Sequence, residues 1–143
     1  GKYELNDKFD NSTIGNVLLK PTKIYLQAIA KISKDFDVVG INNTGYGLKN
    51  FNRISGNFEF FIDKPLKPQP IFELMQKESN FSIKEMYETF NMGMGFFIIC
   101  KSNYTDKILQ IAKEGKIVGE VRKSSKTMTT LNLKNNKIAF EGY

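Results

Sequence analysis

The sequence contains no histidine, no tryptophan and only one cysteine in 143 residues. The absence of histidine removes the commonest general base of enzymes, any Ser-His or Cys-His dyad, and most zinc sites. The lone Cys100 excludes an internal disulfide, and its position in an apolar run predicts an inert buried thiol. Any catalytic contribution must therefore come from carboxylates, lysines, backbone amides or the orientation of a substrate.

Long apolar runs and clustered arginines are also missing. No stretch approaches the ~20 apolar residues of a membrane span, so we expect no membrane association. The net charge of +6 comes from lysines spread along the chain, because the only arginines are Arg53 and Arg122. Nucleic-acid surfaces usually cluster their basic residues, so we expect a phosphorylated small molecule instead of a nucleic acid as the acidic partner. The cysteine usage is consistent with a cytoplasmic protein.

A helix is predicted to begin after residue 82. Ser82 and Glu85 have the spacing of a capping box, in which each side chain satisfies a free backbone N–H of the first turn. We therefore interpret Glu85 as a helix cap. Asn91 is expected to end this helix.

Two glycines follow the predicted helix. Gly93 and Gly95 precede the apolar run Phe96–Cys100, which is typical of an interior strand. Glycines permit a positive φ and a close approach of the backbone to a neighbour. The pair fits either a tight, closely packed turn or a backbone surface that a ligand approaches, and the pattern alone leaves both open.

A second glycine segment lies between a predicted strand over residues 37–42 and a short helix that ends near Ile54. It contains Thr44, Gly45 and Gly47. A strand, a glycine loop and a helix N-terminus can form an anion site, because free N–H groups point outward there. No Gly-Lys-Ser/Thr follows, so the segment is not a P-loop. The pattern fits a phosphate site and a plain turn equally well.

The remaining patterns indicate an α+β fold: a mixed β-sheet of about five or six strands with helices packed on it. Residues 1–17 read as a lead-in or linker, partly disordered, ahead of one domain over residues 18–143. The segment from the strand 96–100 to a strand at 116–121 is expected to be a right-handed crossover unit. Further helices are expected at 21–34, 70–77 and about 105–114, a strand at 57–63, and a hairpin at 127–140 around Asn135 and Asn136.

The string Glu-Met-Tyr-x-Thr-Phe-Asn-Met-Gly-x-Gly over residues 85–95 resembles the signature of aminoimidazole ribonucleotide synthetase, also called phosphoribosylformylglycinamidine cyclo-ligase. Residues 18–25 resemble the segment in which that family enters its C-terminal half. Residues 44–53 are similar to its Thr-Gly-Gly-Gly and Asn-x-Pro-Arg motifs, except that Tyr46 replaces the middle glycine and Asn52 the proline. Residues 118–121 also fit the family pattern.

The resemblance implies that this chain is the C-terminal substrate-cleft domain of a purine-biosynthesis ligase. The whole enzyme uses ATP and Mg²⁺ to close formylglycinamidine ribonucleotide into an imidazole ring. The absent N-terminal half is implied to bind most of the ATP and Mg²⁺ and to form a homodimer. This half then packs against its own N-terminal domain and helps bind and orient the ribonucleotide. Alone, the fragment is expected to be inactive and to bind no cofactor and no metal.

The resemblance and the two glycine segments together nominate substrate-binding residues, but no catalytic residue. The nominated residues are Thr44, Gly45, Gly47, Arg53, Asn91, Gly93 and Gly95. Two alternatives stay open. One is the corresponding half of a related ATP-dependent enzyme, such as selenophosphate synthetase, thiamine-monophosphate kinase or formylglycinamidine ribonucleotide synthetase. The other is a non-catalytic binding module with a degenerate loop, and the presence of Tyr46 in the glycine loop is the evidence for it.

Overall fold

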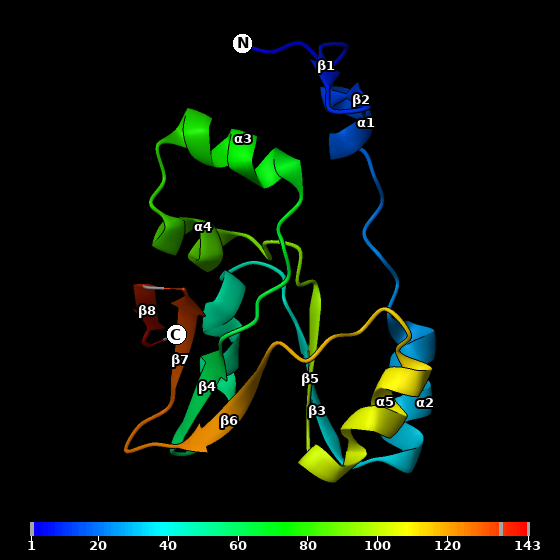
Figure 1. Cartoon of the computed structure of the whole chain (residues 1–143), viewed down its shortest axis with the longest axis vertical. Coiled ribbons are helices and arrows are strands. Elements are labelled where there is room, and N and C mark those ends of the chain that lie inside the picture. Colours follow the sequence, from blue (N-terminus) through cyan, green and yellow to red (C-terminus); the bar gives the residue numbers. More distant parts are fainter. Residues whose placement is uncertain (1, 135, 143) are drawn as a thin grey trace.

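The computed structural model describes residues 2–134 and 136–142. Its main sheet has four strands in the order β6-β4-β7-β8 (Figure 1). A separate antiparallel ribbon pairs β3 with β5. The bounds of these strands are β3 (Val38–Asn42), β4 (Phe58–Ile62), β5 (Phe96–Cys100), β6 (Gly119–Lys123), β7 (Met128–Leu133) and β8 (Asn136–Phe140).

Helices flank both strand groups. In Figure 1, α2 and α5 lie side by side near the ribbon, whereas α4 and the short η1 lie near the four-stranded sheet. The helices of the main body are α2 (Leu26–Asp35), α3 (Pro70–Ser79), α4 (Ile83–Thr89) and α5 (Thr105–Ile111), with 3-10 helices η1 (Gly47–Arg53) and η2 (Ser102–Tyr104). The mixed pairing with flanking helices confirms the α+β class.

The division of the strands differs from the expected single crossover unit. β5 and β6 are joined through α5, but β5 pairs with β3 whereas β6 pairs with β4. The prediction that this segment forms a right-handed crossover within one sheet is therefore wrong. The cause is that strand partners are chosen by long-range contacts, which a local strand–helix–strand pattern does not contain.

β4 is the interior strand of the main sheet. It pairs antiparallel with β6 and parallel with β7, and Phe60 stands opposite Val121 on one side and Thr129 on the other. Among the described residues, β6 has β4 as its only strand neighbour. The Arg122 guanidinium on this edge lies 3.6 Å from the centroid of the Phe61 ring and 3.9 Å from the carboxylate of Glu59, so it contacts two residues of β4.

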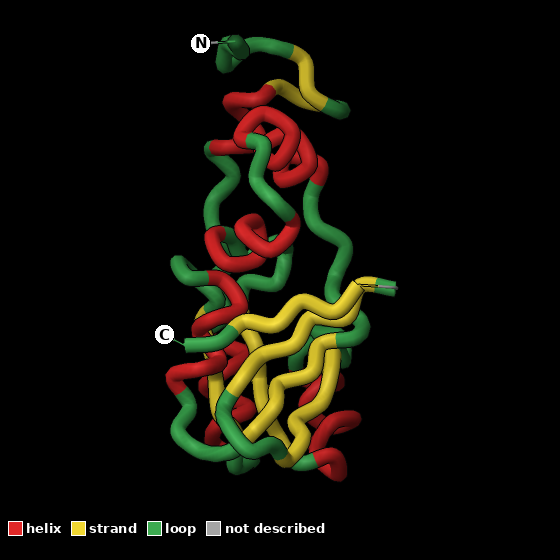
Figure 2. Tube along the Cα trace, turned by 90° about the vertical axis from the view of Figure 1, so that its left-hand side faces the viewer, coloured by secondary structure: helices red, strands yellow, loops and turns green. Residues whose placement is uncertain are grey.

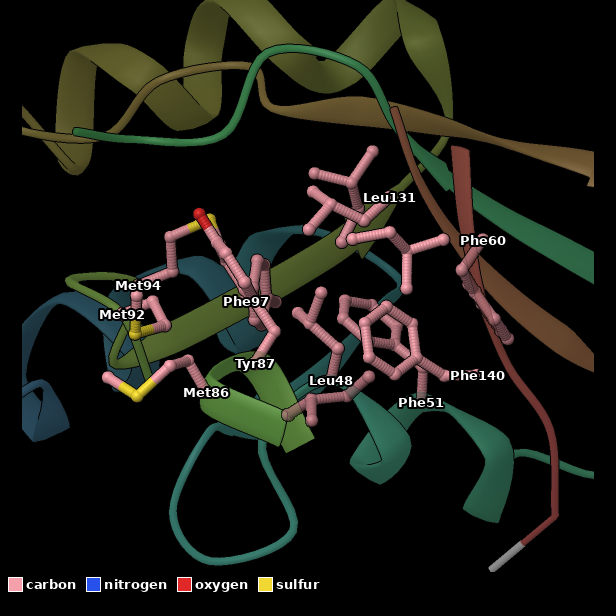
Figure 3. Packing of buried hydrophobic residues seen from close by; sticks show 13 residues of the cluster. Leu48, Phe51, Phe60, Met86, Tyr87, Met92, Met94, Phe97, Leu131 and Phe140 are labelled. Carbon is pink, nitrogen blue, oxygen red and sulfur yellow. The ribbon is translucent and has the colours of Figure 1, made fainter. Parts of the chain in front are cut away.

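The core joins the sheet to η1 and α4. Phe51 is at its centre, with ring centroids 5.0 Å from Phe60 and 4.7 Å from Phe97. Figure 3 shows Met92 and Met94 at one border of this cluster, with their side chains directed into it. Both methionines are almost fully buried. The chain that leaves α4 is therefore anchored to the core at two alternate residues.

Local sequence signals place several helix ends correctly. The capping box is confirmed: the Ser82 hydroxyl accepts from the N–H of Glu85, and the Glu85 carboxylate accepts from the N–H of Ser82. Pro70 occupies the first turn of α3, as expected of a proline. In contrast, α2 begins only at Leu26, later than predicted. Cys100 is half-buried at the end of β5, where full burial was expected.

The predicted C-terminal hairpin is formed by β7 and β8. Leu133 pairs with Asn136, so the turn begins directly after Leu133. Lys134 adopts a left-handed conformation with φ +46°. Asn135, one of the two residues expected in the turn, lies outside the described residues.

The N-terminal segment has local structure of its own. The short strands β1 (Lys8–Phe9) and β2 (Ser12–Thr13) form a hairpin that leads into α1 (Ile14–Leu18). Figure 2 shows this segment at the end of the molecule opposite the sheet. Three hydrogen bonds tie it to Glu78 of α3: Lys2 Nζ donates to Oε1 at 2.9 Å and to Oε2 at 2.8 Å, and the Tyr3 hydroxyl donates to Oε1 at 2.9 Å. None of the helices in the described part of the chain has the length and apolar character that a membrane crossing requires.

Candidate functional site

The loop from Thr44 to Gly47 has three successive residues in the left-handed region. The φ angles are +49° at Gly45, +54° at Tyr46 and +45° at Gly47. Tyr46 therefore adopts a conformation that is easier for the glycine of the family motif. Its side chain is 62% exposed, so the substitution directs a tyrosine largely toward solvent.

The side chain of Asn50 fixes this loop by hydrogen bonds to its backbone carbonyls. Asn50 is buried, and its Nδ2 donates to the carbonyl oxygens of Thr44, Gly45 and Gly47 at 3.3, 2.6 and 2.9 Å. These carbonyls therefore point into the protein. Within the residues that the structure describes, the N–H of Gly45 donates to no protein acceptor. The loop therefore has a backbone donor without a protein acceptor, the kind of group that can bind an anion.

The helix that follows this loop is short and ends at Arg53, close to the predicted end at Ile54. η1 is a 3-10 helix of seven residues, and its peptide dipoles sum to less than those of a long α-helix. An anion at this loop would therefore be bound mainly by individual N–H groups, with little help from a helix dipole.

The turn from Asn91 to Gly95 is held by its own first residue. Asn91 Oδ1 accepts from the N–H of Gly93 at 2.9 Å, and the Asn91 carbonyl accepts from the N–H of Met94 at 2.9 Å. Gly93 has φ +87°, a value that favours glycine. Asn91 Oδ1 is therefore engaged inside the turn.

Asn43 joins the loop to the turn. Its N–H donates to the Gly95 carbonyl at 2.9 Å, and its Nδ2 donates to the Met94 carbonyl at 2.8 Å. Among the described residues, its Oδ1 is buried without a hydrogen-bond partner. Thr44 follows Asn43 directly, so this buried amide connects both glycine segments into one wall.

Five of the seven nominated residues line two depressions that share part of their lining. Thr44 and Arg53 line a hollow of about 400 Å³ on β3, together with Asn50. Asn91, Gly93 and Gly95 line a larger open groove, which Thr44 also borders. Thr44 is therefore the nominated residue that links the two.

Gly45 and Gly47 line neither depression. A Cβ built on Gly45 would meet no atom within 4 Å, so Gly45 lies in open space. A Cβ on Gly47 would lie 1.9 Å from the Tyr87 carbonyl oxygen. Gly47 is thus required for the contact between η1 and α4, and its nomination as a ligand-binding residue gains no geometric support.

The larger groove runs between the β3–β5 ribbon, the four-stranded sheet and α5. Its volume of about 2080 Å³ exceeds the roughly 300–1,000 Å³ of a typical small-molecule site. The part nearest the two glycine segments is the candidate site. The charged residues that line the groove are Lys20, Lys23, Lys64, Lys113 and Lys116, with Asp63, Glu114 and Glu120. Lys23 and Glu114 form an ion pair, so the groove as a whole has a small excess of cations, which favours an anionic ligand.

Two polar residues of this part of the groove were not nominated from the sequence. A Cβ on Gly93 would lie 3.2 Å from Gln69 Oε1, and a Cβ on Gly95 would lie 2.3 Å from the Tyr25 hydroxyl oxygen. Tyr25 appeared in the sequence only within a family segment and an apolar helix face. Neither residue carries a local signal, because each reaches the turn through tertiary contacts.

Two ionisable groups on α4, the helix that precedes the turn, have shifted pKa values. Hydrogen bonds from the Ser82 hydroxyl and backbone lower the pKa of Glu85 below its usual value of 4.5. Burial raises the pKa of Tyr87, whose ring lies in the core. Both groups keep their ordinary charge at neutral pH and support the helix, so neither is an acid or base candidate.

These features define a class: an α+β domain that presents two glycine segments on one wall of an open groove. Residues 2–131 match the family described as AIR synthase related protein, C-terminal domain. The chain belongs to this family, and the resemblance noted in the sequence is thereby confirmed.

Several curated relatives carry the name phosphoribosylformylglycinamidine cyclo-ligase. The protein of Methanopyrus kandleri is 34% identical over 125 residues, which cover 84% of this chain and 36% of the relative. That of Methanocaldococcus jannaschii is 32% identical over 141 residues, covering 96% and 40%. That of Methanococcoides burtonii is 43% identical over 114 residues, covering 79% and 33%. The chain thus spans between a third and two fifths of these relatives.

Proposed function

We propose that this chain is the ribonucleotide-orienting half of an ATP-dependent cyclo-ligase of purine biosynthesis. In this proposal the full-length protein closes formylglycinamidine ribonucleotide to aminoimidazole ribonucleotide. The observation that supports it most is the connection made by Asn43, which joins the two family glycine motifs into one wall beside a cationic groove. The names of the curated relatives give the substrate class.

The ligand phosphate is proposed to bind at the hollow beside β3. Thr44 and Arg53 line this hollow and bring a hydroxyl and a guanidinium, and the N–H of Gly45 in the adjacent loop donates to no protein acceptor among the described residues. Arginine is well suited to this role because its planar fork can donate two hydrogen bonds to a phosphate. The rest of the ribonucleotide would extend past Thr44 toward the turn at Asn91, Gly93 and Gly95.

ATP and Mg²⁺ are proposed to bind mainly to the part of the full-length protein that this chain does not contain. Among residues 2–134 and 136–142, no group of three or more histidine, cysteine or acidic side chains could hold a metal ion. ATP supplies the energy of ring closure when bound, and the residues of this chain bind and orient the ribonucleotide. The fragment is proposed to be inactive alone, and the complete protein to be a cytoplasmic homodimer.

The test is an amide NMR titration of this chain with formylglycinamidine ribonucleotide and, separately, with ATP-Mg²⁺. We expect the ribonucleotide to shift the amides of Gly45, Gly93 and Gly95, and ATP-Mg²⁺ to leave them unchanged. Shifts with ATP-Mg²⁺ alone would assign nucleotide binding to this half and reject the proposed division of roles. A ribonucleotide that shifts none of the three amides contradicts the proposal.

The two arginines offer a matched pair of variants. Arg53→Gln is expected to weaken ribonucleotide binding about tenfold or more, because a charge-assisted hydrogen bond to phosphate is lost. Arg122→Gln removes the same charge from β6, where Arg122 pairs with Glu120 at 2.7 Å, and should leave the affinity unchanged. Equal losses in both variants would show that only the net charge matters.

A further inference from the structure

Tyr25 is fixed at the start of α2, beside the turn. Tyr25 is the N-cap of α2, and its backbone carbonyl accepts a hydrogen bond from the N–H of Ile29 at 3.0 Å. Its ring packs against Phe96 of β5 with the centroids 5.4 Å apart. The side chain is half-buried and lines the groove. Backbone and ring are thus both held, so the position of the hydroxyl is defined.

The hydroxyl of Tyr25 accounts for the glycine at position 95. Gly95 is not among the glycines with positive φ, so its backbone conformation does not require glycine. A Cβ at this position would instead lie 2.3 Å from the Tyr25 hydroxyl oxygen and 3.2 Å from its Cζ. The missing side chain makes room for the tip of the phenol directly on the turn.

No group of the described protein bonds to this hydroxyl. The nearby carbonyls of Met94 and Gly95 already accept from Nδ2 and N–H of Asn43, and no hydrogen bond of the Tyr25 hydroxyl exists within the described residues. Partly buried tyrosines usually find a partner for the hydroxyl. An ordered phenol with an open hydroxyl at the wall of a groove is therefore suited to bind a ligand.

We propose that Tyr25 is a further substrate-contacting residue, whose hydroxyl donates a hydrogen bond to an oxygen of the ribonucleotide outside its phosphate. The inference rests on the proposed function. The phosphate is assigned to the hollow at Thr44 and Arg53. Tyr25 lies beside Gly95, in the other of the two glycine segments. Gly95 is the positioning residue that seats the phenol.

The test compares Tyr25→Phe with Tyr104→Phe, using formylglycinamidine ribonucleotide and inorganic phosphate as probes of this chain. Tyr104 is a matched control, because it is also half-buried and packs on a phenylalanine, Phe36, at 5.3 Å, but does not line the groove. We expect Tyr25→Phe to weaken ribonucleotide binding about tenfold, with phosphate binding unchanged. Tyr104→Phe should change neither.

Gly95→Ala tests the positioning role. Its added methyl should displace the phenol and weaken ribonucleotide binding to a similar extent. In the Tyr25→Phe background, the same change should cost clearly less, because the hydroxyl that it displaces is gone. Equal costs in the two backgrounds would overturn the role of Gly95. Urea unfolding of each variant shows whether the fold is kept.

The outcomes separate the inference from the proposed function. If Arg53→Gln weakens ribonucleotide binding while Tyr25→Phe does not, the inference fails and the proposed function stands. If Tyr25→Phe weakens phosphate and ribonucleotide binding equally, the hydroxyl contacts the phosphate or acts through the fold, and the inference also fails. If the unmodified chain does not bind the ribonucleotide, both fail.

Discussion

The loop at residues 44–47 and the turn at 91–95 look alike in the sequence, because each carries two glycines one residue apart. In the structure the glycines of each pair have different roles. Gly47 and Gly95 have close neighbours, a backbone carbonyl and a phenol, whereas Gly45 lies in open space and Gly93 has looser contacts. A glycine pair in the sequence therefore does not predict which of its two glycines is packed against the protein and which is open.

The means of support also differ between the two segments. Asn50 holds the loop from behind through three carbonyls, and Asn91 closes the turn from within. Asn43 is the link between them, and its buried Oδ1 lacks a partner among the described residues. The loop is therefore clamped locally, whereas the loop and the turn are held side by side by the β3–β5 ladder, in which Asn42 pairs with Phe96, and by the Asn43 side chain.

Gly47→Ala should have the largest effect, because it places a Cβ 1.9 Å from the Tyr87 carbonyl, which is backbone and cannot rotate away. With the cost of a left-handed alanine added, we expect a loss of about 3 kcal/mol or more in the free energy of unfolding. Gly45→Ala has a similar φ but open space, and should lose only about 1–2 kcal/mol. Urea denaturation measures both, and equal losses would reject the packing role of Gly47.

Asn43→Ala and Asn50→Ala should each cost about 2 kcal/mol, since each leaves buried carbonyls without a donor. The NMR pattern should distinguish them. Asn50→Ala is expected to shift Gly45 and leave Gly95 in place, whereas Asn43→Ala should shift both. A shift confined to one segment in both variants would show that Asn43 does not couple them.

Asn52 provides the control for these asparagine variants. It lies in the same 3-10 helix, but its Nδ2 donates to the Phe140 carbonyl at 3.0 Å, and its Oδ1 accepts from Thr129 Oγ1 at 3.0 Å. Asn52→Ala should therefore loosen the end of β8 and leave both glycine segments unchanged. The residue that replaces the family proline thus has a role of its own, in the C-terminal strand.

The smallest expected effect is the pH dependence of the capping box, which holds the helix between the two segments. The pKa of Glu85 is lowered in the folded state, so its contribution to stability is present above its usual value of 4.5 and disappears as the pH falls through the lower folded value. Glu85→Gln should be less stable than the unmodified chain at pH 7, with the difference vanishing in acid. A difference that persists at pH 2 would contradict this account.

The sequence predicts features whose causes are local. The capping box at Ser82 and Glu85 depends on residues three apart, and Pro70 at the start of α3 depends on proline itself. Thr44 and Asn91, which the family motifs nominated, line the groove, and their binding of a substrate stays a prediction. What failed or was missed depends on distant partners: β5 and β6 pair in separate groups, and Tyr25 meets Gly95 across seventy positions of the chain.

The charged edge strand β6 has a consequence for how copies of this domain behave in solution. An unpaired strand edge is a template on which a second chain can add a strand. On β6, Glu120 and Arg122 form an ion pair at 2.7 Å, and Lys123 follows them at the exposed end. Charged side chains on an edge strand are one of the features by which natural sheets discourage the pairing of a further strand. The strand that ends the sheet on this side therefore carries a feature that disfavours edge-to-edge pairing.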